Sequence, residues 1–502
     1  MTSFKDFFLE FLSPIFKGFL NVLNAILEWI IDSFNVVKYI EIINEYAGEM
    51  SGISWILVAL TVLLLLALFG AIIYFIVKGV KGFIRYRKNV SNQETLMEQV
   101  EMLNRDIIKY QDEKENYEKM LKPEEGLVEY DEEGNIINAL QEGECRFNRL
   151  AKVDEAMKKY KAPKTNDTIN LKEFCEMFRN YSANQLGLYY PEKIIRLFVA
   201  SLASNKLIIL QGISGTGKTS LAYAFGKFLN NDACICPVQP SWRDRSEVFG
   251  YFNEFTKRFN ETDLLVKMYE ATYQDRVFIG VLDEMNISRV EYYFAEMLSL
   301  LEMPKEEYRV LSVVPSGWDN DPKNMKEGKL VIPPNMWYVG TINNDDSTFM
   351  VTDKVYDRAM PINIDEKADP FTAPETKALD MTYTHLRDLF LRAEKDYKVS
   401  DEVLEKLALV DKYIIEHFRI AFGNRIVKQL TEFVPAYVAC GATEVEGVDY
   451  VIANKILRKF DQLNLGLVRN EIDGFIAYLD ELFGKDAMKE CIAYLNRLKK
   501  MI

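Results

Sequence analysis

Residues 211–220 read QGISGTGKTS, and this stretch decides the fold. Gly212 to Thr219 fit the pattern G-x-x-x-x-G-K-[ST], in which successive backbone N–H groups turn toward one phosphate cluster. The apolar run KLIIL (206–210) precedes the loop and the helical run SLAYAFGKFL (220–229) follows it. A strand, a glycine-rich loop and a helix in that order place a phosphate at a helix N-terminus. The stretch therefore predicts a loop that binds a nucleotide.

The loop also predicts how the nucleotide is held. We expect the Lys218 ammonium to reach the outer phosphates and the Thr219 hydroxyl to hold Mg²⁺. The cofactors expected here are ATP and Mg²⁺. The candidate binding residues are Gly212, Ile213, Ser214, Gly215, Thr216, Gly217, Lys218, Thr219 and Ser220.

Short apolar runs alternate with helical stretches on both sides of the loop. They are KLIIL (206–210), CICPV (234–238), VFIGVL (277–282), MWYVGTI (336–342) and MPINI (360–364). Such alternation indicates a parallel sheet covered by helices on both faces. After residue 371 the strand signals fade. We predict an α/β fold, with a five-stranded parallel sheet in a nucleotide-binding domain at 170–370 and a helical lid and C-terminal helical region at 371–502.

Two carboxylates, Asp283 and Glu284, follow the run VFIGVL directly. Side chains at the C-terminal end of a parallel strand lie on the same edge of the sheet as the phosphate loop. We expect Asp283 to hold the hydrated Mg²⁺ and Glu284 to polarise the attacking water. Ser288 and Glu291 have the spacing of a capping box, which predicts that a helix begins there.

Three longer stretches resemble the AAA+ ATPases of the McrB-related, dynein-related group. They are VQPSWRDRSEVFGYFN (238–253), VLDEMNISRVEYYFAEMLSLLE (281–302) and IPPNMWYVGTINNDDSTFMVTDKVYDRA (332–359). The resemblance covers residues 170–460 and implies an AAA+ P-loop NTPase that forms a homo-oligomeric, hexameric ring. McrB itself has N-T-A-D-R-S after its first sensor and uses GTP. This chain has NNDDST (343–348) and lacks that arginine, so ATP is favoured and GTP remains an alternative.

The resemblance also implies roles for three further residues. Asn343 matches sensor 1, Arg358 matches the arginine finger, and Arg425 in FGNRI (422–426) matches a second sensor in the lid. Asn343 ends a strand beside Asp283 and Glu284 and can hydrogen-bond the water or the γ-phosphate. Arg358 precedes the fifth strand, far from its own phosphate loop, so it can serve a neighbour. The alternatives are structural: Asn343 ends a strand, and Arg358 and Arg425 form local ion pairs.

Residues Ile53–Val77 form an uncharged run of 25 residues, which is long enough to cross a bilayer as a helix. Acidic residues precede the run, and basic residues follow it between Lys78 and Lys88. Because positive flanks stay in the cytoplasm, we predict one transmembrane helix within 51–88 at the cell membrane. The nucleotide-binding domain is then expected in the cytoplasm.

The rest of the N-terminal part gives weaker signals. Residues 1–50 predict an amphipathic segment, with a second membrane pass as the alternative. Residues 89–123 carry a heptad pattern from Leu96 to Leu121 and predict a short coiled coil, with one helix packed on a domain as the alternative. Residues 124–169 are expected to form a linker region with short elements.

Composition limits the class of partner. The net charge of -14 gives no bulk attraction to nucleic acid, although a local basic patch stays open. Cys234 and Cys236 form a C-x-C pair on one face of a strand, and no second cluster completes a zinc site. His385 and His417 fit no metal or triad pattern.

These observations favour a membrane-anchored AAA+ ATPase that remodels or translocates an unknown protein substrate or effector. One alternative is the ATP- or GTP-driven subunit of a defence or restriction-type system that recruits a separate nuclease. Another is a nucleotide-gated membrane scaffold with little turnover.

Overall fold

The structure is a computed structural model of the 502-residue chain. It describes residues 143–343, 348–463 and 465–500, together with Leu140 and short stretches between residues 17 and 78, chiefly 35–49, 51–53 and 55–60. The chain divides into two compact units, Met1–Pro123 and Glu124–Ile502, and each is described by itself.

The described part of the first unit contains helix α2 (Val36–Tyr46), whose Asn35 side chain accepts a hydrogen bond from the Lys38 N–H at 3.4 Å. Among the residues that the structure describes, no helix is both long and apolar enough to span a bilayer. Most of the run Ile53–Val77 and all of the heptad stretch 89–123 lie outside the described residues. The transmembrane helix and the coiled coil therefore stay predictions.

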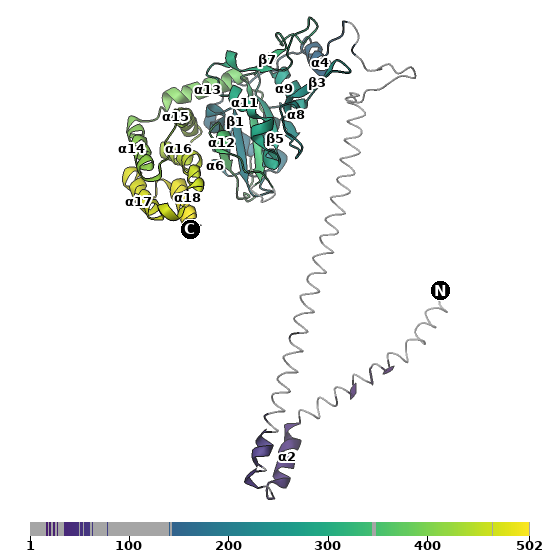
Figure 1. Cartoon of the computed structure of the whole chain (residues 1–502), viewed down its shortest axis with the longest axis vertical. Helices are drawn as coiled ribbons and strands as arrows, with labels where there is room; N and C mark the ends of the chain where they lie inside the picture. Colours follow the sequence, from purple (N-terminus) through teal and green to yellow (C-terminus); the bar gives the residue numbers. More distant parts are fainter. Residues whose placement is uncertain are drawn as a thin grey trace, which may run out of the picture. The chain divides into compact units, whose positions relative to one another are not determined.

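A five-stranded parallel sheet forms the centre of the second unit (Figure 1). Its strands are β1 (Leu207–Gly212), β2 (Cys234–Pro237), β5 (Phe278–Asp283), β8 (Met336–Asn343) and β9 (Ala359–Asn363). They lie in the order β2-β5-β8-β1-β9, and every neighbouring pair is parallel. The five predicted runs are thus confirmed as strands of one parallel sheet.

Both faces of this sheet are buried because helices cover each of them. Side chains alternate along β1, so Ile208 and Leu210 join one hydrophobic cluster while Leu207 and Ile209 join the other. The first cluster includes residues of α5 (Leu171–Leu186), α6 (Glu192–Ser204) and α7 (Lys218–Phe228), and the second includes residues of α9 (Asp263–Ala271), α10 (Val290–Tyr293) and α11 (Ala295–Leu300). This burial explains why the strands read as continuous apolar runs.

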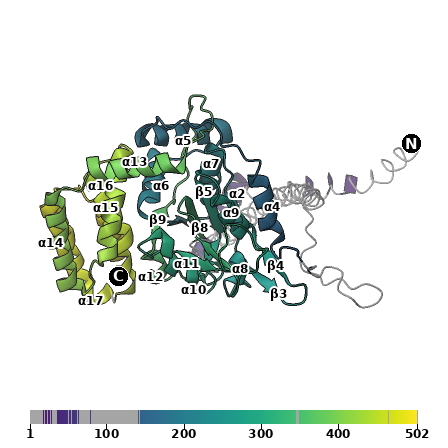
Figure 2. The ribbon, with the colours of Figure 1, turned by 90° about the horizontal axis from the view of Figure 1, so that it is seen from above.

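From Tyr383 onward the described chain is helical, as the sequence predicts (Figure 2), whereas residues 364–382 contain no helix. The α-helices are α13 (Tyr383–Asp396), α14 (Asp401–Phe418), α15 (Asn424–Ala439), α16 (Glu444–Val451), α17 (Leu465–Phe483) and α18 (Lys489–Lys500). A π-helix η3 (Ile452–Ile456) and a 3₁₀-helix η4 (Leu457–Gln462) join α16 to the segment before α17.

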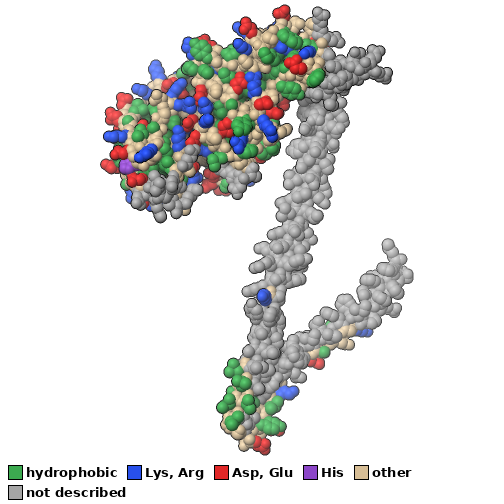
Figure 3. Space-filling view, in the orientation of Figure 1, with side chains coloured by type: hydrophobic (Ala, Val, Ile, Leu, Met, Phe, Trp, Pro, Cys, Tyr) green, Lys and Arg blue, Asp and Glu red, His purple; other side chains and the backbone are tan. Residues whose placement is uncertain are grey.

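Charges of both signs are mixed over the surface of the second unit. On the face shown in Figure 3, Lys and Arg side chains lie among Asp and Glu side chains on both the sheet part and the helical part. Interspersed charges favour solubility and do not create a strong field of one sign. This visible face therefore gives no electrostatic reason to expect nucleic acid.

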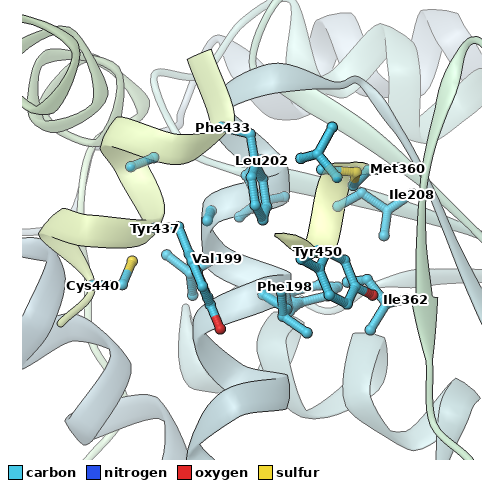
Figure 4. Packing of buried hydrophobic residues seen from close by; sticks show 14 of the residues in the cluster. Phe198, Val199, Leu202, Ile208, Met360, Ile362, Phe433, Tyr437, Cys440 and Tyr450 are labelled. Atoms are coloured by element: carbon cyan, nitrogen blue, oxygen red, sulfur yellow. The ribbon is translucent and has the colours of Figure 1, made fainter. Parts of the chain in front are cut away.

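The helical region shares one hydrophobic core with the sheet. Figure 4 shows Phe433 and Tyr437 of α15 close to Val199 and Leu202 of α6, with Tyr450 of α16 close by. All five side chains are buried. The continuous packing fixes α15, which carries Arg425, against the sheet domain.

Helix α4 (Asn148–Met157) lies within the predicted linker region, 124–169, and packs into the second unit. Phe147 and Leu150 are fully buried. Arg146 forms a buried ion pair with Asp321, with a shortest N–O distance of 2.7 Å. The later part of this region is therefore folded onto the domain and does more than connect two parts of the chain.

Short elements complete the unit. They are the hairpin β3 (Gly250–Asn253) and β4 (Arg258–Glu261), the hairpin β6 (Val310–Ser312) and β7 (Lys329–Val331), and the helices α8 (Ser246–Phe249), η1 (Met285–Ile287), η2 (Glu306–Tyr308) and α12 (Asp353–Tyr356).

The predicted capping box at Ser288 is wrong. The Ser288 hydroxyl donates to the buried Trp242 carbonyl at 2.6 Å, and Glu291 accepts from the Thr352 hydroxyl at 2.6 Å.

Candidate active site

Three glycines of the phosphate loop have backbone conformations that other residues rarely adopt, and among them Gly215 has a φ of 80°. Gly212 has a φ of 144°, and a Cβ there would lie 2.4 Å from the Ile364 carbonyl oxygen. Gly217 has a φ of 89° and directly precedes α7. The loop can therefore turn sharply between β1 and the N-terminus of α7, where backbone N–H groups favour a phosphate.

The Lys218 side chain extends back across the loop. Its Nζ atom donates to the carbonyl oxygens of Ile213 at 2.7 Å and Gly212 at 3.1 Å. The residue is 6% exposed, so its charge is held close to the loop. From this position the ammonium can meet the outer phosphates, as the sequence predicts.

Asp283 lies at the centre of a small oxygen cluster. Its Oδ1 atom accepts hydrogen bonds from the Thr219 hydroxyl at 2.6 Å and the Thr341 hydroxyl at 2.8 Å. Hydroxyl and carboxylate oxygens are the hard ligands that Mg²⁺ prefers, and Mg²⁺ commonly takes only one or two from the protein. Thr219 and Asp283 fit a Mg²⁺ ion that also contacts phosphates and water.

Thr219 and Asp283 are the two protein ligands expected for this Mg²⁺ ion. Within the described ranges, no group of three or more His, Cys, Asp or Glu side chains could hold a metal ion. Cys234 and Cys236 lie on β2 with their sulfur atoms 3.7 Å apart, as expected for one face of a strand. A dedicated protein cage for a metal is thus not found in this part of the chain.

Glu284 is placed beside Asn343 at the edge of the sheet. The Asn343 amide donates to Glu284 Oε1 at 3.2 Å, and the Glu284 N–H donates to the Thr341 hydroxyl at 2.8 Å. Glu284 has a φ of 53°, a left-handed conformation that is strained for a residue with a side chain. The two contacts hold the carboxylate toward the pocket, where it can orient a water molecule.

These residues line one pocket of about 250 Å³ at the C-terminal edge of the sheet. Its lining comprises Ser214, Gly215, Gly217, Lys218, Thr219, Ser220, Asp283, Glu284, Thr341 and Asn343. Every lining residue except Thr341 was predicted from the sequence. Of the other predicted loop residues, Gly212 and Ile213 accept from Lys218, and Thr216 donates from its hydroxyl to the Ile213 carbonyl at 2.9 Å.

Sequence reasoning missed Thr341 and Tyr190. Thr341 precedes Asn343 by two residues on β8, and this alternation places both side chains on one face of the strand. The signal was therefore present in the sequence. Tyr190 precedes α6, and its buried hydroxyl donates to the Gly217 carbonyl at 3.0 Å. Burial raises the pKa of Tyr190, so the hydroxyl stays a proton donor at ordinary pH. No local pattern marks this contact.

Arg358 and Arg425 do not line the phosphate pocket. Both pair with Glu302: Arg358 Nε lies 2.8 Å from one carboxylate oxygen and Arg425 Nη2 lies 2.6 Å from the other. All three line a second, larger cavity. The structure thus gathers Lys218, Thr219 and the β5 and β8 residues at one site, and the two arginines at another.

Comparison with known proteins gives partial similarity. No family model matches the chain. The chain is 23% identical over 176 residues to the "Type IV methyl-directed restriction enzyme EcoKMcrB subunit" of Escherichia coli (strain K12). That match covers 33% of this chain and 36% of the relative's length.

A similar solved structure is a full-length MCM homologue from Methanopyrus kandleri, with a TM-score of 0.31 and 12% identity, over 60% of this chain and 59% of the other. At that score it carries no argument about this protein. The parallel sheet, the phosphate loop and the partial similarity to the McrB subunit together support an AAA+ nucleoside triphosphatase.

Proposed function

We propose that this chain is an AAA+ ATPase that hydrolyses ATP with Mg²⁺. The observation that carries the proposal is the position of Glu284, held by Asn343 and Thr341 beside the phosphate loop. In this arrangement Lys218 and the loop bind phosphates, Thr219 and Asp283 hold Mg²⁺, and Glu284 orients the attacking water. The Asn343 amide is placed to contact that water or the γ-phosphate. The bound Mg²⁺ would neutralise charge that develops on the phosphates.

Replacing Glu284 by Gln tests hydrolysis directly. The amide keeps the shape of the side chain and loses the charge that orients water, so turnover should fall by roughly 10²–10⁴-fold while ATP still binds. Glu291→Gln is the matched control, because an amide oxygen there can still accept from Thr352. Near-normal turnover of the Glu284→Gln variant would refute the assignment. Measuring ATP and GTP in parallel tests the choice of nucleotide.

The proposal includes a membrane anchor at residues 51–88, with the second unit in the cytoplasm. The uncharged run Ile53–Val77 supports it, and so do three exposed apolar side chains at its start: Ile53 is exposed by 74%, Ile56 by 68% and Trp55 by 43%. Exposed apolar side chains in one segment favour contact with lipid. The full chain should resist extraction from membranes by carbonate, whereas a chain beginning at Val90 should be soluble. If both chains pellet with membranes, this run is not the anchor.

The proposal also includes a ring of identical subunits that acts on an unknown protein substrate or effector. Arg358 supports the ring, because it lies outside the phosphate pocket and can serve a nucleotide that another copy holds. The acidic net charge and the mixed charges in Figure 3 favour a protein over nucleic acid as the direct substrate.

A second candidate function is an NTP-driven subunit of a defence system that recruits a separate nuclease. The similarity to a restriction-enzyme subunit favours it. Capture of the Glu284→Gln variant from native membranes in ATP or GTP tests it, since a nuclease should then copurify. A nucleotide-gated scaffold is the remaining alternative, and the absence of measurable ATP turnover in the assembled protein would favour it.

A further inference from the structure

The second cavity lies at the N-terminal edge of the parallel sheet, whereas the phosphate pocket lies at the C-terminal edge, and the two share no lining residue. It has a volume of about 550 Å³ and is lined by the end of α6, the start of β1, the end of α11 and the segment after it, Arg358 directly before β9, α13 and α15. Its charged lining residues are Lys206, Arg309, Arg358, Arg387, Arg425 and Lys428, against Glu302, Glu306, Glu394 and Glu432. Burial lowers the pKa of Lys206 to about 7, but the five other cations still outnumber the four carboxylates, which favours an anionic ligand.

Glu302 divides its two carboxylate oxygens between two arginines. Oε2 lies 2.8 Å from Arg358 Nε, and Oε1 lies 2.6 Å from Arg425 Nη2. Arg358 is further held by a bond from Nη1 to the Lys354 carbonyl at 2.9 Å. Glu302 and Arg358 are each 24% exposed, so this ion pair is partly shielded from water. One carboxylate therefore occupies the space between both guanidinium groups.

A guanidinium group binds carboxylate and phosphate oxygens with the same geometry. Glu302 therefore lies where a phosphate oxygen would lie between Arg358 and Arg425, in an ion pair in which neither Arg358 Nε nor Glu302 Oε1 forms a hydrogen bond. A terminal phosphate carries more negative charge than a carboxylate, so it can compete for the same donors. The remaining cations of the cavity favour the more highly charged anion.

We infer that Glu302 is an internal competitor for the terminal phosphates of a nucleotide held by an adjacent copy of this chain. The inference rests on the proposed ring. In a free subunit Glu302 keeps Arg358 and Arg425 together at the cavity. When a neighbour presents its nucleotide, the phosphates replace Glu302 between the two arginines. Glu302 is thus a positioning residue that sets how readily subunits join around a nucleotide.

The test is the concentration dependence of ATPase activity in the full-length chain. Glu302→Gln keeps the size of the side chain and removes the competing charge. The protein concentration at half-maximal specific activity should fall by about tenfold, the effect of a change of about 1.4 kcal/mol in association. The turnover number of the assembled protein should stay within about twofold, because the arginines remain. Glu302→Asp keeps the charge and should keep the wild-type concentration dependence.

Glu307→Gln is the matched control, since it removes the same charge five residues away on the surface, where Glu307 pairs with Lys305 at 3.4 Å. It should leave the concentration dependence unchanged. If Glu302→Gln behaves like this control, or lowers turnover without changing association, the inference is overturned. Sedimentation with a non-hydrolysable ATP analogue gives the same comparison without turnover.

The results that would contradict the ring proposal differ from those that would contradict the role of Glu302. If wild-type specific activity does not depend on protein concentration and the Arg358→Ala variant is fully active, no neighbour contributes to the site. If wild-type activity does depend on concentration and only the response to Glu302→Gln is missing, the ring stands and the role of Glu302 is refuted. Thermal unfolding of each variant shows whether a lost activity reflects a lost fold.

Discussion

The phosphate pocket and the Glu302 cavity are both rich in charge, but they are built differently. In the first, Lys218 and Thr219 come from the N-terminus of α7, and Asp283 and Glu284 come from the C-terminal end of β5. Thr219 donates to Asp283, and Asn343 of β8 donates to Glu284. In the second, Glu302 joins two arginines, one directly before β9 and one on α15. The first site lines a pocket that can take a nucleotide. In the second, an internal carboxylate, Glu302, already pairs with two of the cations.

This difference separates what one chain can do alone from what it needs a partner to do. A single copy holds every residue expected to bind nucleotide and Mg²⁺ and to orient the water. No arginine is among the residues that line the phosphate pocket of the same copy. Under the ring proposal, the second site completes the first site of the next copy.

Among variants that test the division between the two sites, Arg358→Ala should have the largest effect. If Arg358 stabilises charge on a neighbour's γ-phosphate, its loss should lower turnover by roughly 10³-fold while nucleotide affinity stays close to normal. The measurement is steady-state hydrolysis beside the binding of a fluorescent ATP analogue. Full activity of this variant would make Arg358 a structural residue only.

Mixing two inactive variants sharpens this prediction. In mixed rings, Arg358 from a Lys218→Ala copy can face the intact phosphate loop of an Arg358→Ala copy. Part of the activity should therefore return under conditions where subunits exchange, although neither variant alone has such a site. No recovery, together with an inactive Arg358→Ala variant, would indicate that the arginine acts within its own chain or that a ring needs all its sites.

The next largest effect is expected on the binding of ATP by a single chain. Lys218→Ala removes the charge that meets the outer phosphates, so ATP affinity should fall by about 100-fold. Lys227→Ala is the control, because this lysine lies on the same helix and pairs with Asp232 on the surface. Calorimetric titration of both variants with ATP measures the difference. Equal ATP affinities of the two variants would contradict the assignment of the loop at 212–219 as the phosphate-binding loop.

The first site could be read from the sequence, and the second could not. The phosphate loop and the residues after VFIGVL follow local rules, since one strand, one turn and one helix place them. The five strands were also predictable, because burial on both faces leaves continuous apolar runs. Glu302 and Arg425 are far apart in the chain, and their contact depends on how α15 packs against α6. No local pattern encodes that packing.

The wrong capping-box prediction and the missed Tyr190 have the same physical origin, which is tertiary packing. Ser288 and Glu291 have the spacing of a capping box, but tertiary partners, Trp242 and Thr352, take their side chains instead. Tyr190 meets the phosphate loop only because the segment before α6 lies against it. Thr341 is the exception, since its place two residues before Asn343 was visible in the sequence.

Thr341→Val tests whether this missed residue supports the catalytic carboxylate. Valine has nearly the same shape and lacks the hydroxyl that bonds Asp283 and the Glu284 N–H. Because a strained Glu284 would lose one of its two contacts, turnover should fall by about tenfold with a smaller effect on ATP affinity. Thr341→Ser restores the hydroxyl and should recover most of the turnover. If serine and valine behave alike, the hydroxyl plays no part in positioning Glu284.

The smallest effect is expected at Tyr190, and it tests how rigidly one chain prepares its phosphate loop. The Tyr190 hydroxyl donates to the carbonyl of Gly217, the residue that precedes α7 and whose own N–H belongs to the phosphate cradle. Tyr190→Phe keeps the buried ring and removes one hydrogen bond, which is worth about 0.5–1.5 kcal/mol. If the loop is preorganised by this bond, ATP affinity should fall by about threefold to tenfold, and turnover at saturating ATP should hardly change. A fall in thermal stability with unchanged affinity would place the contribution of the bond in the fold. In that case the loop would take its shape from its own glycines, and the first site would depend on the surrounding domain even less than the contacts suggest.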